Sequence, residues 1–154
     1  MRVPIRSAQP EDYAALHALD QACFPPGIAW SKAELGFFLR YPGNLVLIAE
    51  NDQGGIAGFS IAGTERRSGR LTGRLITIDV RDEHRRQGVG HALLSAIEER
   101  LRAQGVETVK LEVAVDNAAA QEFYARHGFT RTGRIPGYYL GRIDALVMEK
   151  PLQP

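Results

Sequence analysis

The spacing of apolar residues in the second half of the chain predicts alternating helices and strands. Residues 88–103 place an apolar side chain at every fourth position, as on the buried face of an amphipathic helix. Residues 108–115 alternate apolar and polar side chains, as in a strand with one buried face. Residues 117–127 predict another helix, because Asn117 is a favoured N-cap residue and Gly128 suits the helix end. This order predicts a mixed sheet with helices on its faces.

The first half of the chain predicts two helices followed by strands. Residues 11–23 have apolar positions at helical spacing. Ser31 and Glu34 match a capping box that begins a second helix, which Pro42 ends. The remaining strands are predicted at residues 3–6, 45–50, 56–62, 75–80, 129–134 and 142–150.

Two connections are predicted between the strands of the first half. Residues 52–55 have the composition of a hairpin turn. Residues 63–74 carry several arginines among Gly, Ser and Thr, which predicts a solvated loop. The alternative for this segment is a contact surface for an acidic partner. The arginines are Arg66, Arg67, Arg70 and Arg74.

Composition narrows the class of protein. A length of 154 residues predicts a single domain spanning residues 1–154. Lys plus Arg number 19 against 18 Asp plus Glu, a balance that argues against nucleic-acid binding. The only cysteine, Cys23, excludes an internal disulfide and favours a reducing, cytoplasmic location. Neither a membrane-spanning apolar run nor a signal-peptide core at residues 1–6 is present, so no membrane partner is expected.

The segment Arg85-Arg86-Gln87-Gly88-Val89-Gly90 is the most informative one. It lies between a predicted strand ending at Val80 and a predicted helix. A helix N-terminus offers free N–H groups to a phosphate, glycines allow a close approach, and arginines add charge. A dinucleotide fingerprint would need glycine in place of Leu93, and a P-loop would need Gly-Lys-Ser/Thr. The segment therefore predicts a pyrophosphate cradle of another kind.

This segment resembles the Gln/Arg-x-x-Gly-x-Gly/Ala motif of the GNAT superfamily of N-acetyltransferases. Other segments are similar to its ribosomal-protein-alanine N-acetyltransferase (RimI-type) branch. The resemblance implies an α/β fold with a mixed, mostly antiparallel sheet of about seven strands and helices on both faces. The similar segments are Ile5-Arg6-x-Ala8 with Asp12, Trp30-Ser31, Leu111-Glu112-Val113, Asn117-Ala118-Ala119-Ala120, Phe123-Tyr124, Gly128-Phe129 and Tyr138-Tyr139.

The resemblance also implies acetyl-coenzyme A as the cosubstrate and no metal. The backbone of residues 78–80 would hold the pantetheine arm and the acetyl carbonyl. Many members of this branch have a small or apolar residue at the position of Asp79, so a carboxylate is expected beside the acetyl group. The cofactor-binding residues that the resemblance implies are Ile78, Asp79, Val80, Arg85, Arg86, Gln87, Gly88, Val89, Gly90, His91 and Asn117.

Acetyl transfer to an amine needs a proton acceptor for the amine and a donor for the departing thiolate. The resemblance implies Glu112 as the acceptor and Tyr124 as the donor. Without it, Glu112 reads as a solvent-facing strand residue and Tyr124 as a core residue beside Phe123. No histidine is placed to activate Cys23, which favours direct transfer in a ternary complex.

The favoured acceptor, by resemblance, is a protein N-terminal α-amine bound with the help of Tyr138 and Tyr139. A small-molecule amine is the alternative, supported by Asp79 and by a final hairpin, residues 137–145, shorter than the branch's usual one. A non-catalytic coenzyme A-binding sensor is a third possibility, and the protein is expected to be a monomer or homodimer. The histidines lack metal-ligand spacing.

Overall fold

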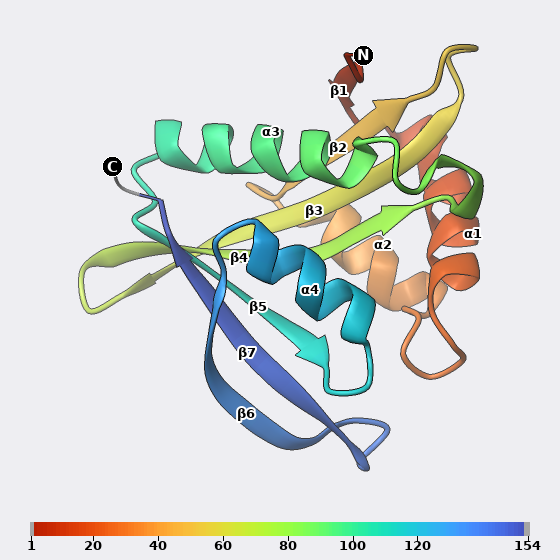
Figure 1. Cartoon of the computed structure of the whole chain (residues 1–154). Helices are drawn as coiled ribbons and strands as arrows, with labels where there is room; N and C mark the ends of the chain where they lie inside the picture. Colours follow the sequence, from red (N-terminus) through yellow and green to blue (C-terminus); the bar gives the residue numbers. More distant parts are fainter. Residues whose placement is uncertain (1, 153–154) are drawn as a thin grey trace.

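The computed structural model describes residues 2–152 and forms one seven-stranded sheet in the order β1-β2-β3-β4-β5-β7-β6 (Figure 1). Only β4 and β5 pair in parallel, whereas the other neighbours are antiparallel. The mixed, mostly antiparallel sheet predicted from the sequence is therefore confirmed. The strands are β1 (Ile5–Ser7), β2 (Leu45–Glu50), β3 (Ile56–Arg67), β4 (Arg70–Val80), β5 (Thr108–Ala114), β6 (Thr130–Tyr139) and β7 (Ile143–Pro151).

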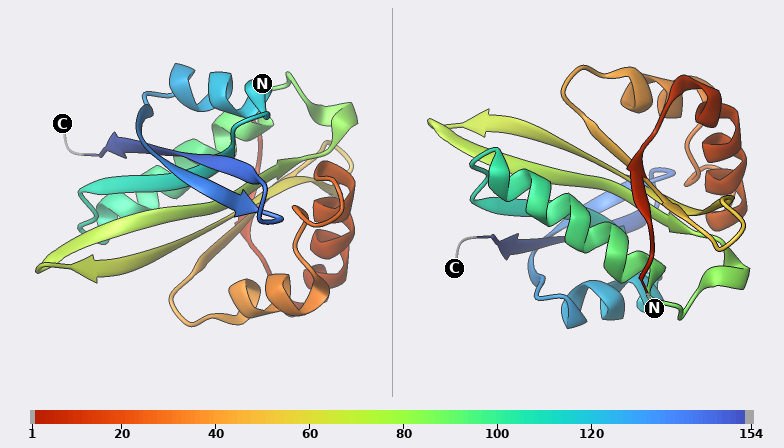
Figure 2. Two further views of the ribbon diagram at one scale, coloured as in Figure 1. Left: turned by 90° about the horizontal axis from the view of Figure 1, so that it is seen from below. Right: turned by 90° about the horizontal axis from the view of Figure 1, so that it is seen from above.

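Helices cover both faces of the sheet (Figure 2). One face carries α1 and α2, which bury Leu16 and Leu35 against Phe59 of β3. The opposite face carries α3 and α4, and there Leu93 and Ile97 of α3 are fully buried. The helices are α1 (Tyr13–Cys23), α2 (Lys32–Arg40), α3 (Val89–Ala103) and α4 (Ala118–Arg126). No helix within residues 2–152 has the length and hydropathy needed to cross a membrane.

The predicted helix caps are confirmed. At the start of α2 the Glu34 N–H donates to Ser31 Oγ at 3.1 Å, and the Ser31 N–H donates to Glu34 Oε1 at 2.9 Å. At the start of α4 the Ala120 N–H donates to Asn117 Oδ1 at 3.1 Å. These bonds satisfy amides that a helix end otherwise leaves unpaired, and they fix where each helix begins.

The solvated loop predicted for residues 63–74 is wrong. Strand β3 continues to Arg67 and β4 begins at Arg70, so the segment is a long hairpin with Ser68 and Gly69 as its turn. Both turn residues have positive φ angles, 49° and 78°, which suits a tight hairpin. Residues 64–70 are exposed, so no buried face imposes an apolar alternation that would mark the strands. The hairpin brings Arg74 into the sheet.

Strands β4 and β5 separate along their length. They pair only through Thr72–Arg74 of β4 and Thr108–Lys110 of β5. Residues 75–80 and 111–114 have no partners across this interface, and the two strands diverge in Figure 1. The centre of the sheet therefore has a stretch without backbone pairing between β4 and β5, which we call the opening. The predicted residues Ile78 to Val80 lie on its β4 side and Glu112 on its β5 side.

Gly58 of β3 keeps β3 close to the diverging part of β4. A Cβ at Gly58 would lie 2.6 Å from the Asp79 carbonyl oxygen and 3.3 Å from Val80 Cα, both backbone atoms. We expect Gly58→Ala to destabilise the fold by about 1–3 kcal/mol, the usual range for overpacking. Gly133→Ala is the matched control, because its nearest contact would be an ordinary 3.6 Å from Val147 Cβ. Denaturant unfolding compares the two, and equal stabilities would contradict this assignment of β3–β4 packing.

Candidate active site

The predicted phosphate cradle lies at the N-terminus of α3. Gly88 is its N-cap with φ 82°, and the first bond of the helix runs from the Ala92 N–H to the Gly88 carbonyl at 2.9 Å. The amides of Val89, Gly90 and His91 therefore have no partner within the helix. A Cβ at Gly88 would meet nothing within 4 Å, so the space beside this N-cap residue is open. The arrangement fits a pyrophosphate.

Gly90, the second glycine of the motif, is required by the packing of α3 against α4. A Cβ at Gly90 would lie 3.1 and 3.2 Å from ring atoms of Phe123. Glycine thus lets α3 approach α4 closely, and the N-terminal end of α3 stays next to the helix that carries Tyr124.

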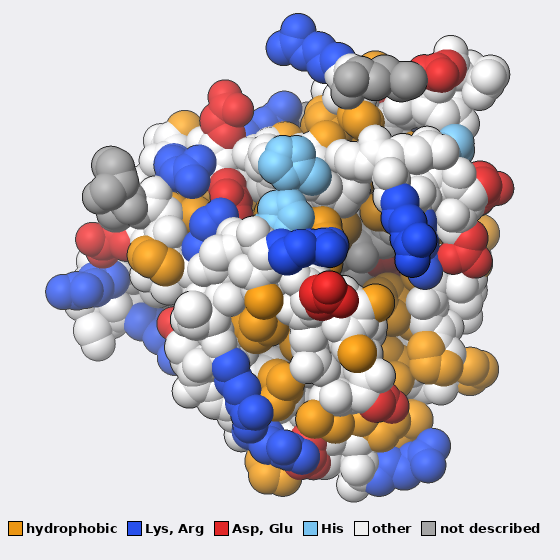
Figure 3. Space-filling model, viewed as in Figure 1, with side chains coloured by type: hydrophobic (Ala, Val, Ile, Leu, Met, Phe, Trp, Pro, Cys, Tyr) orange, Lys and Arg blue, Asp and Glu red, His pale blue; other side chains and the backbone are white. Residues whose placement is uncertain are grey.

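Arg85 and Arg86 directly precede the cradle in the chain, and on the face shown in Figure 3 Lys, Arg and His side chains lie among Asp and Glu side chains. Arg85 is half-exposed; its Nε donates to the Val80 carbonyl at 3.3 Å, and its Nη1 lies 3.2 Å from Asp82. Arg86 has a positive φ of 64°. The predicted motif residues thus follow directly on the open end of β4.

Two histidines meet beside the cradle, which the sequence did not predict. His91 Nδ1 lies 3.0 Å from His127 Nε2, and His127 Nδ1 lies 2.7 Å from the Phe123 carbonyl oxygen. A carbonyl can only accept, so His127 Nδ1 donates to it. The α4 end therefore contributes His127 to the edge of the cradle.

Gln87 and Asn117 make contacts within the protein. Gln87 Nε2 donates to the Glu83 carbonyl at 3.3 Å, within the turn before α3. Asn117 uses its side-chain oxygen to cap α4. Their contacts with a cofactor stay predictions.

Glu112 lies on β5 with one carboxylate oxygen fully engaged. Its Oε1 accepts from Arg74 Nη2 at 2.9 Å, from Arg74 Nε at 3.2 Å and from the Tyr138 hydroxyl at 3.4 Å. Its Oε2 has no hydrogen-bond partner among residues 2–152, although the side chain is only 11% exposed. The Arg74 ion pair fixes the orientation of the Glu112 carboxylate. Because Arg74 was predicted to lie in a loop, the sequence missed this partner.

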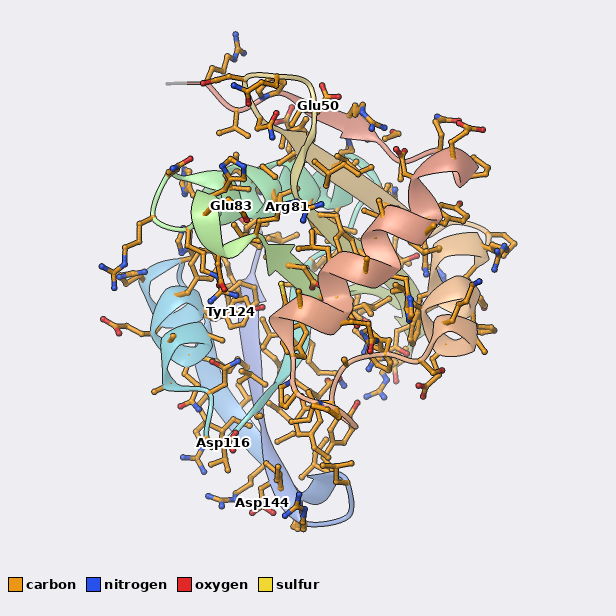
Figure 4. The ribbon with its side chains drawn as sticks, turned by 90° about the vertical axis from the view of Figure 1, so that its right-hand side faces the viewer. Glu50, Arg81, Glu83, Asp116, Tyr124 and Asp144 are labelled. Carbon is orange, nitrogen blue, oxygen red and sulfur yellow. The ribbon has the colours of Figure 1, made fainter. Side chains whose placement is uncertain are left out.

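Tyr124 lies on α4 and points into the space between α4 and α1 (Figure 4). Its ring packs against Phe123 and Phe129, with centroid separations of 5.4 and 5.6 Å. Its hydroxyl makes no hydrogen bond within the described part of the chain. Burial, and then the charge of Asp79, raise the pKa of Tyr124 above its usual range. The phenol is therefore protonated at neutral pH and free to donate.

The Asp79 side chain lies between β4 and α1, and its place beside the acetyl group stays a prediction. It is 1% exposed, and its Oδ1 accepts from the Thr77 hydroxyl at 2.5 Å. Ile78 and Val80, its neighbours on β4, pack against the core on the α3 side, whereas Asp79 lies against Asp20 of α1.

Tyr138 and Tyr139 lie at the end of β6, next to Glu112. Tyr138 also accepts a hydrogen bond from Arg74 Nη2 at 3.3 Å, and its ring centroid is 4.9 Å from that of Tyr139. Leu140, at the tip of the β6–β7 hairpin, packs directly against Gly27 in the α1–α2 connection. The predicted acceptor-binding residues and Glu112 thus form one cluster, bordered by this contact.

Cys23 is not suited to nucleophilic catalysis. Burial, and then the charge of Asp79, raise the pKa of Cys23 to about 11. The thiol is therefore protonated at neutral pH, whereas the nucleophile would be the thiolate. Within residues 2–152, no group of three or more His, Cys, Asp or Glu side chains is arranged to hold a metal ion.

The family follows from a direct comparison. The acetyltransferase (GNAT) family model matches residues 13–129, which include the cradle, Glu112 and Tyr124. The chain belongs to this family. Among its relatives, an uncharacterized N-acetyltransferase of Methanocaldococcus jannaschii is 31% identical over 147 residues, covering 95% of this chain and 90% of the relative.

Two GNAT relatives have named acceptors. The [ribosomal protein bS18]-alanine N-acetyltransferase of Escherichia coli is 40% identical over 81 residues, about half of each chain. Its crystal structure matches 99% of this chain and 96% of its own, with a TM-score of 0.82 and 29% identity. The L-methionine sulfoximine/L-methionine sulfone acetyltransferase of Pseudomonas paraeruginosa is 33% identical over 113 residues, covering 71% of this chain and 66% of the relative.

Proposed function

We propose that this GNAT protein transfers the acetyl group of acetyl-coenzyme A directly to the α-amine of a protein N-terminus. The observation that carries the proposal is the unequal use of the two Glu112 oxygens. Arg74 and Tyr138 hold Oε1, which leaves Oε2 as a fixed proton acceptor at the opening between β4 and β5. The similarity to the Escherichia coli alanine N-acetyltransferase supports a polypeptide acceptor.

The cofactor fits the open amides at the start of α3. Val89, Gly90 and His91 would bind the pyrophosphate, with Arg85 and Arg86 adding charge. The thioester would then lie along residues 78–80 of β4, whose side facing β5 is unpaired there. When bound, acetyl-coenzyme A supplies an activated acyl group.

The protein's own groups manage the protons. The amine nitrogen attacks the thioester carbonyl, the carbon–sulfur bond breaks, and Glu112 Oε2 accepts the proton that the nitrogen loses. The Tyr124 hydroxyl donates to the departing sulfur, and a backbone N–H of residues 78–80 stabilises the charge on the carbonyl oxygen. Cys23 is protonated and is therefore a poor nucleophile, so the acetyl group passes directly to the amine without an acyl-enzyme intermediate.

A small-molecule amine is the second candidate acceptor. The contact between Leu140 and Gly27 closes one side of the Tyr138 cluster, which favours a compact acceptor. The similarity to an acetyltransferase named for L-methionine sulfoximine points the same way. A cytoplasmic location and a monomeric or homodimeric state also stay predictions.

A panel of acceptors tests whether the enzyme prefers a protein N-terminus or a small-molecule amine. We expect peptides beginning with Ala or Ser to have a kcat/KM at least about tenfold above that of polyamines and free amino acids, since the Tyr138 cluster would bind residues beyond the amine. Coenzyme A release measures the rate for each acceptor. Robust acetylation of a polyamine or an amino-acid analogue, with no acetylation of the peptides, would contradict the protein N-terminus and favour the small-molecule amine as the acceptor.

Replacing Arg85 and Arg86 tests the cradle. We expect Arg85→Ala with Arg86→Ala to weaken acetyl-coenzyme A binding by about 10- to 100-fold, because charge-assisted contacts contribute ~1.5–3 kcal/mol when desolvated and less when exposed. Calorimetry measures the affinity, and pantetheine fragments without the pyrophosphate should bind both proteins equally. Arg66→Ala with Arg70→Ala, in the β3–β4 hairpin, removes the same charge as a control. Equal weakening in both variants would contradict the cradle.

A further inference from the structure

Two buried carboxyl groups meet between α1 and β4, outside the groups that touch the acetyl group in the proposed reaction. Asp20 is 0% exposed and Asp79 1% exposed. Each has one oxygen with a donor: Asp20 Oδ2 accepts from the Trp30 N–H at 2.7 Å, and Asp79 Oδ1 accepts from Thr77. The other two oxygens, Asp20 Oδ1 and Asp79 Oδ2, are buried with no donor among residues 2–152.

The two carboxyl groups lie within hydrogen-bonding reach of each other. Two ionised carboxylates cannot bond, because neither has a hydrogen to donate. Two like charges buried together are also strongly unfavourable. A single proton shared between them removes both problems, since the protonated group donates to the other. Burial, and then Asp20, raise the pKa of Asp79 well above its usual range, which agrees with a proton retained there.

The charged and titratable groups around the two aspartates do not offset a second negative charge. Arg85 is the cation that acts on Asp79, but it is half-exposed and paired with Asp82. The remaining titratable neighbours are the Cys23 thiol of α1 and the Tyr124 phenol of α4, and the pKa values of both are raised by Asp79. None of these groups donates a hydrogen bond to Asp20 Oδ1 or Asp79 Oδ2.

The pair connects three parts of the molecule around the site. Asp20 belongs to α1, and Trp30 to the α1–α2 connection, which Gln21 also holds through a 2.7 Å bond to the Trp30 carbonyl. Asp79 lies in the part of β4 that β5 does not pair with. We propose that Asp20 and Asp79 share one proton, and that this shared proton clamps α1 to the open end of β4, so that Asp20 is a positioning residue for acetyl transfer. The positioning role rests on the proposed function, whereas the shared proton does not.

Removing the pair tests the shared proton. In the unfolded chain both aspartates are ionised above about pH 5, so the native protein binds one proton more than the unfolded protein. Native stability should therefore fall as pH rises, up to the raised pKa. The unfolding constant of the wild type relative to Asp20→Asn/Asp79→Asn should rise about tenfold per pH unit above about pH 5. A ratio of the two unfolding constants that does not change with pH would contradict the shared proton.

An infrared measurement gives the same answer without the double variant. The wild type at neutral pH should show the carbonyl band of one buried protonated carboxyl group, and Asp20→Asn should lack it. In that variant the amide N–H replaces the proton as the donor to Asp79, while the amide oxygen still accepts from Trp30. Absence of the band in the wild type, or its persistence in Asp20→Asn, would contradict the proposal.

Kinetics test the positioning role. Asp20→Ala should lower kcat about tenfold or more with little change in acetyl-coenzyme A affinity, and Asp20→Asn should restore most of it. The ratio of wild-type to Asp20→Asn activity should fall at alkaline pH, where the wild-type pair loses its proton, and the titration of the acceptor amine cancels in this ratio. A wild-type kcat in Asp20→Ala, or a ratio independent of pH, would overturn the positioning role. Absence of transfer by the wild type to any amine would contradict the proposed function instead, and the infrared band would still decide the shared proton.

Discussion

Tyr124→Phe is expected to lower kcat by roughly 10²–10⁴-fold, the usual range for a positioned acid. The substitution removes a hydroxyl that makes no hydrogen bond within the described chain, so the packing against Phe123 and Phe129 should be kept. The KM for acetyl-coenzyme A should change much less, because the proposed phosphate contacts lie at α3. Steady-state kinetics with a peptide acceptor measure both values.

An acetyl donor with a more acidic thiol gives the sharper comparison for Tyr124. Its thiolate leaves without help, so it should recover much of the activity that Tyr124→Phe loses. Tyr13→Phe is the matched control, since it removes a hydroxyl that donates to the Leu39 carbonyl between α1 and α2. Equal impairment with both donors would indicate a positioning role for Tyr124. Wild-type turnover in Tyr124→Phe would show that Tyr124 only packs in the core and takes no part in the reaction.

Glu112→Gln is expected to lower kcat by roughly 10²–10⁴-fold near neutral pH, because the amide keeps the shape but loses the basic oxygen. The loss should shrink as pH rises, since more of the acceptor amine is then already deprotonated. Acetyl-coenzyme A affinity should be nearly unchanged. A pH profile of kcat/KM for the peptide measures the effect.

Two other carboxylates complete the test of Glu112. Glu149→Gln makes the same change on the same side of the sheet, beside Lys110, and should leave the profile unaltered. Asp79→Asn tests the rival base. A larger pH-dependent defect in Asp79→Asn than in Glu112→Gln would move the proton acceptor to Asp79.

Local patterns predicted most of the fold. Each expected strand and helix is present, because amphipathic alternation and capping residues such as Ser31 and Asn117 act within a few positions. The hairpin of β3 and β4 was missed for the opposite reason. Its exposed arginines lie beyond the core, so burial imposes no pattern on them.

The site was predicted in part. The cradle is readable from Gly88 and its neighbours because a helix start is a local structure. Pairs that depend on tertiary packing were not readable: Arg74 and Glu112, on β4 and β5, are 38 positions apart, and His91 and His127, on α3 and at the end of α4, are 36. Asp20 gave no signal, since a single aspartate in a helix pattern reads as a solvated residue. Its partner was noticed only because Asp79 departs from the family's usual residue.

The most direct test of acetyl transfer to a protein N-terminus is a competition followed by mass-spectrometric mapping of the product. A peptide that begins with alanine and contains one internal lysine is mixed with an equal amount of spermidine, the enzyme and acetyl-coenzyme A. The proposed function predicts that the acetyl group is found on the peptide's α-nitrogen. An acetyl group found mainly on spermidine or on the lysine side chain would contradict it.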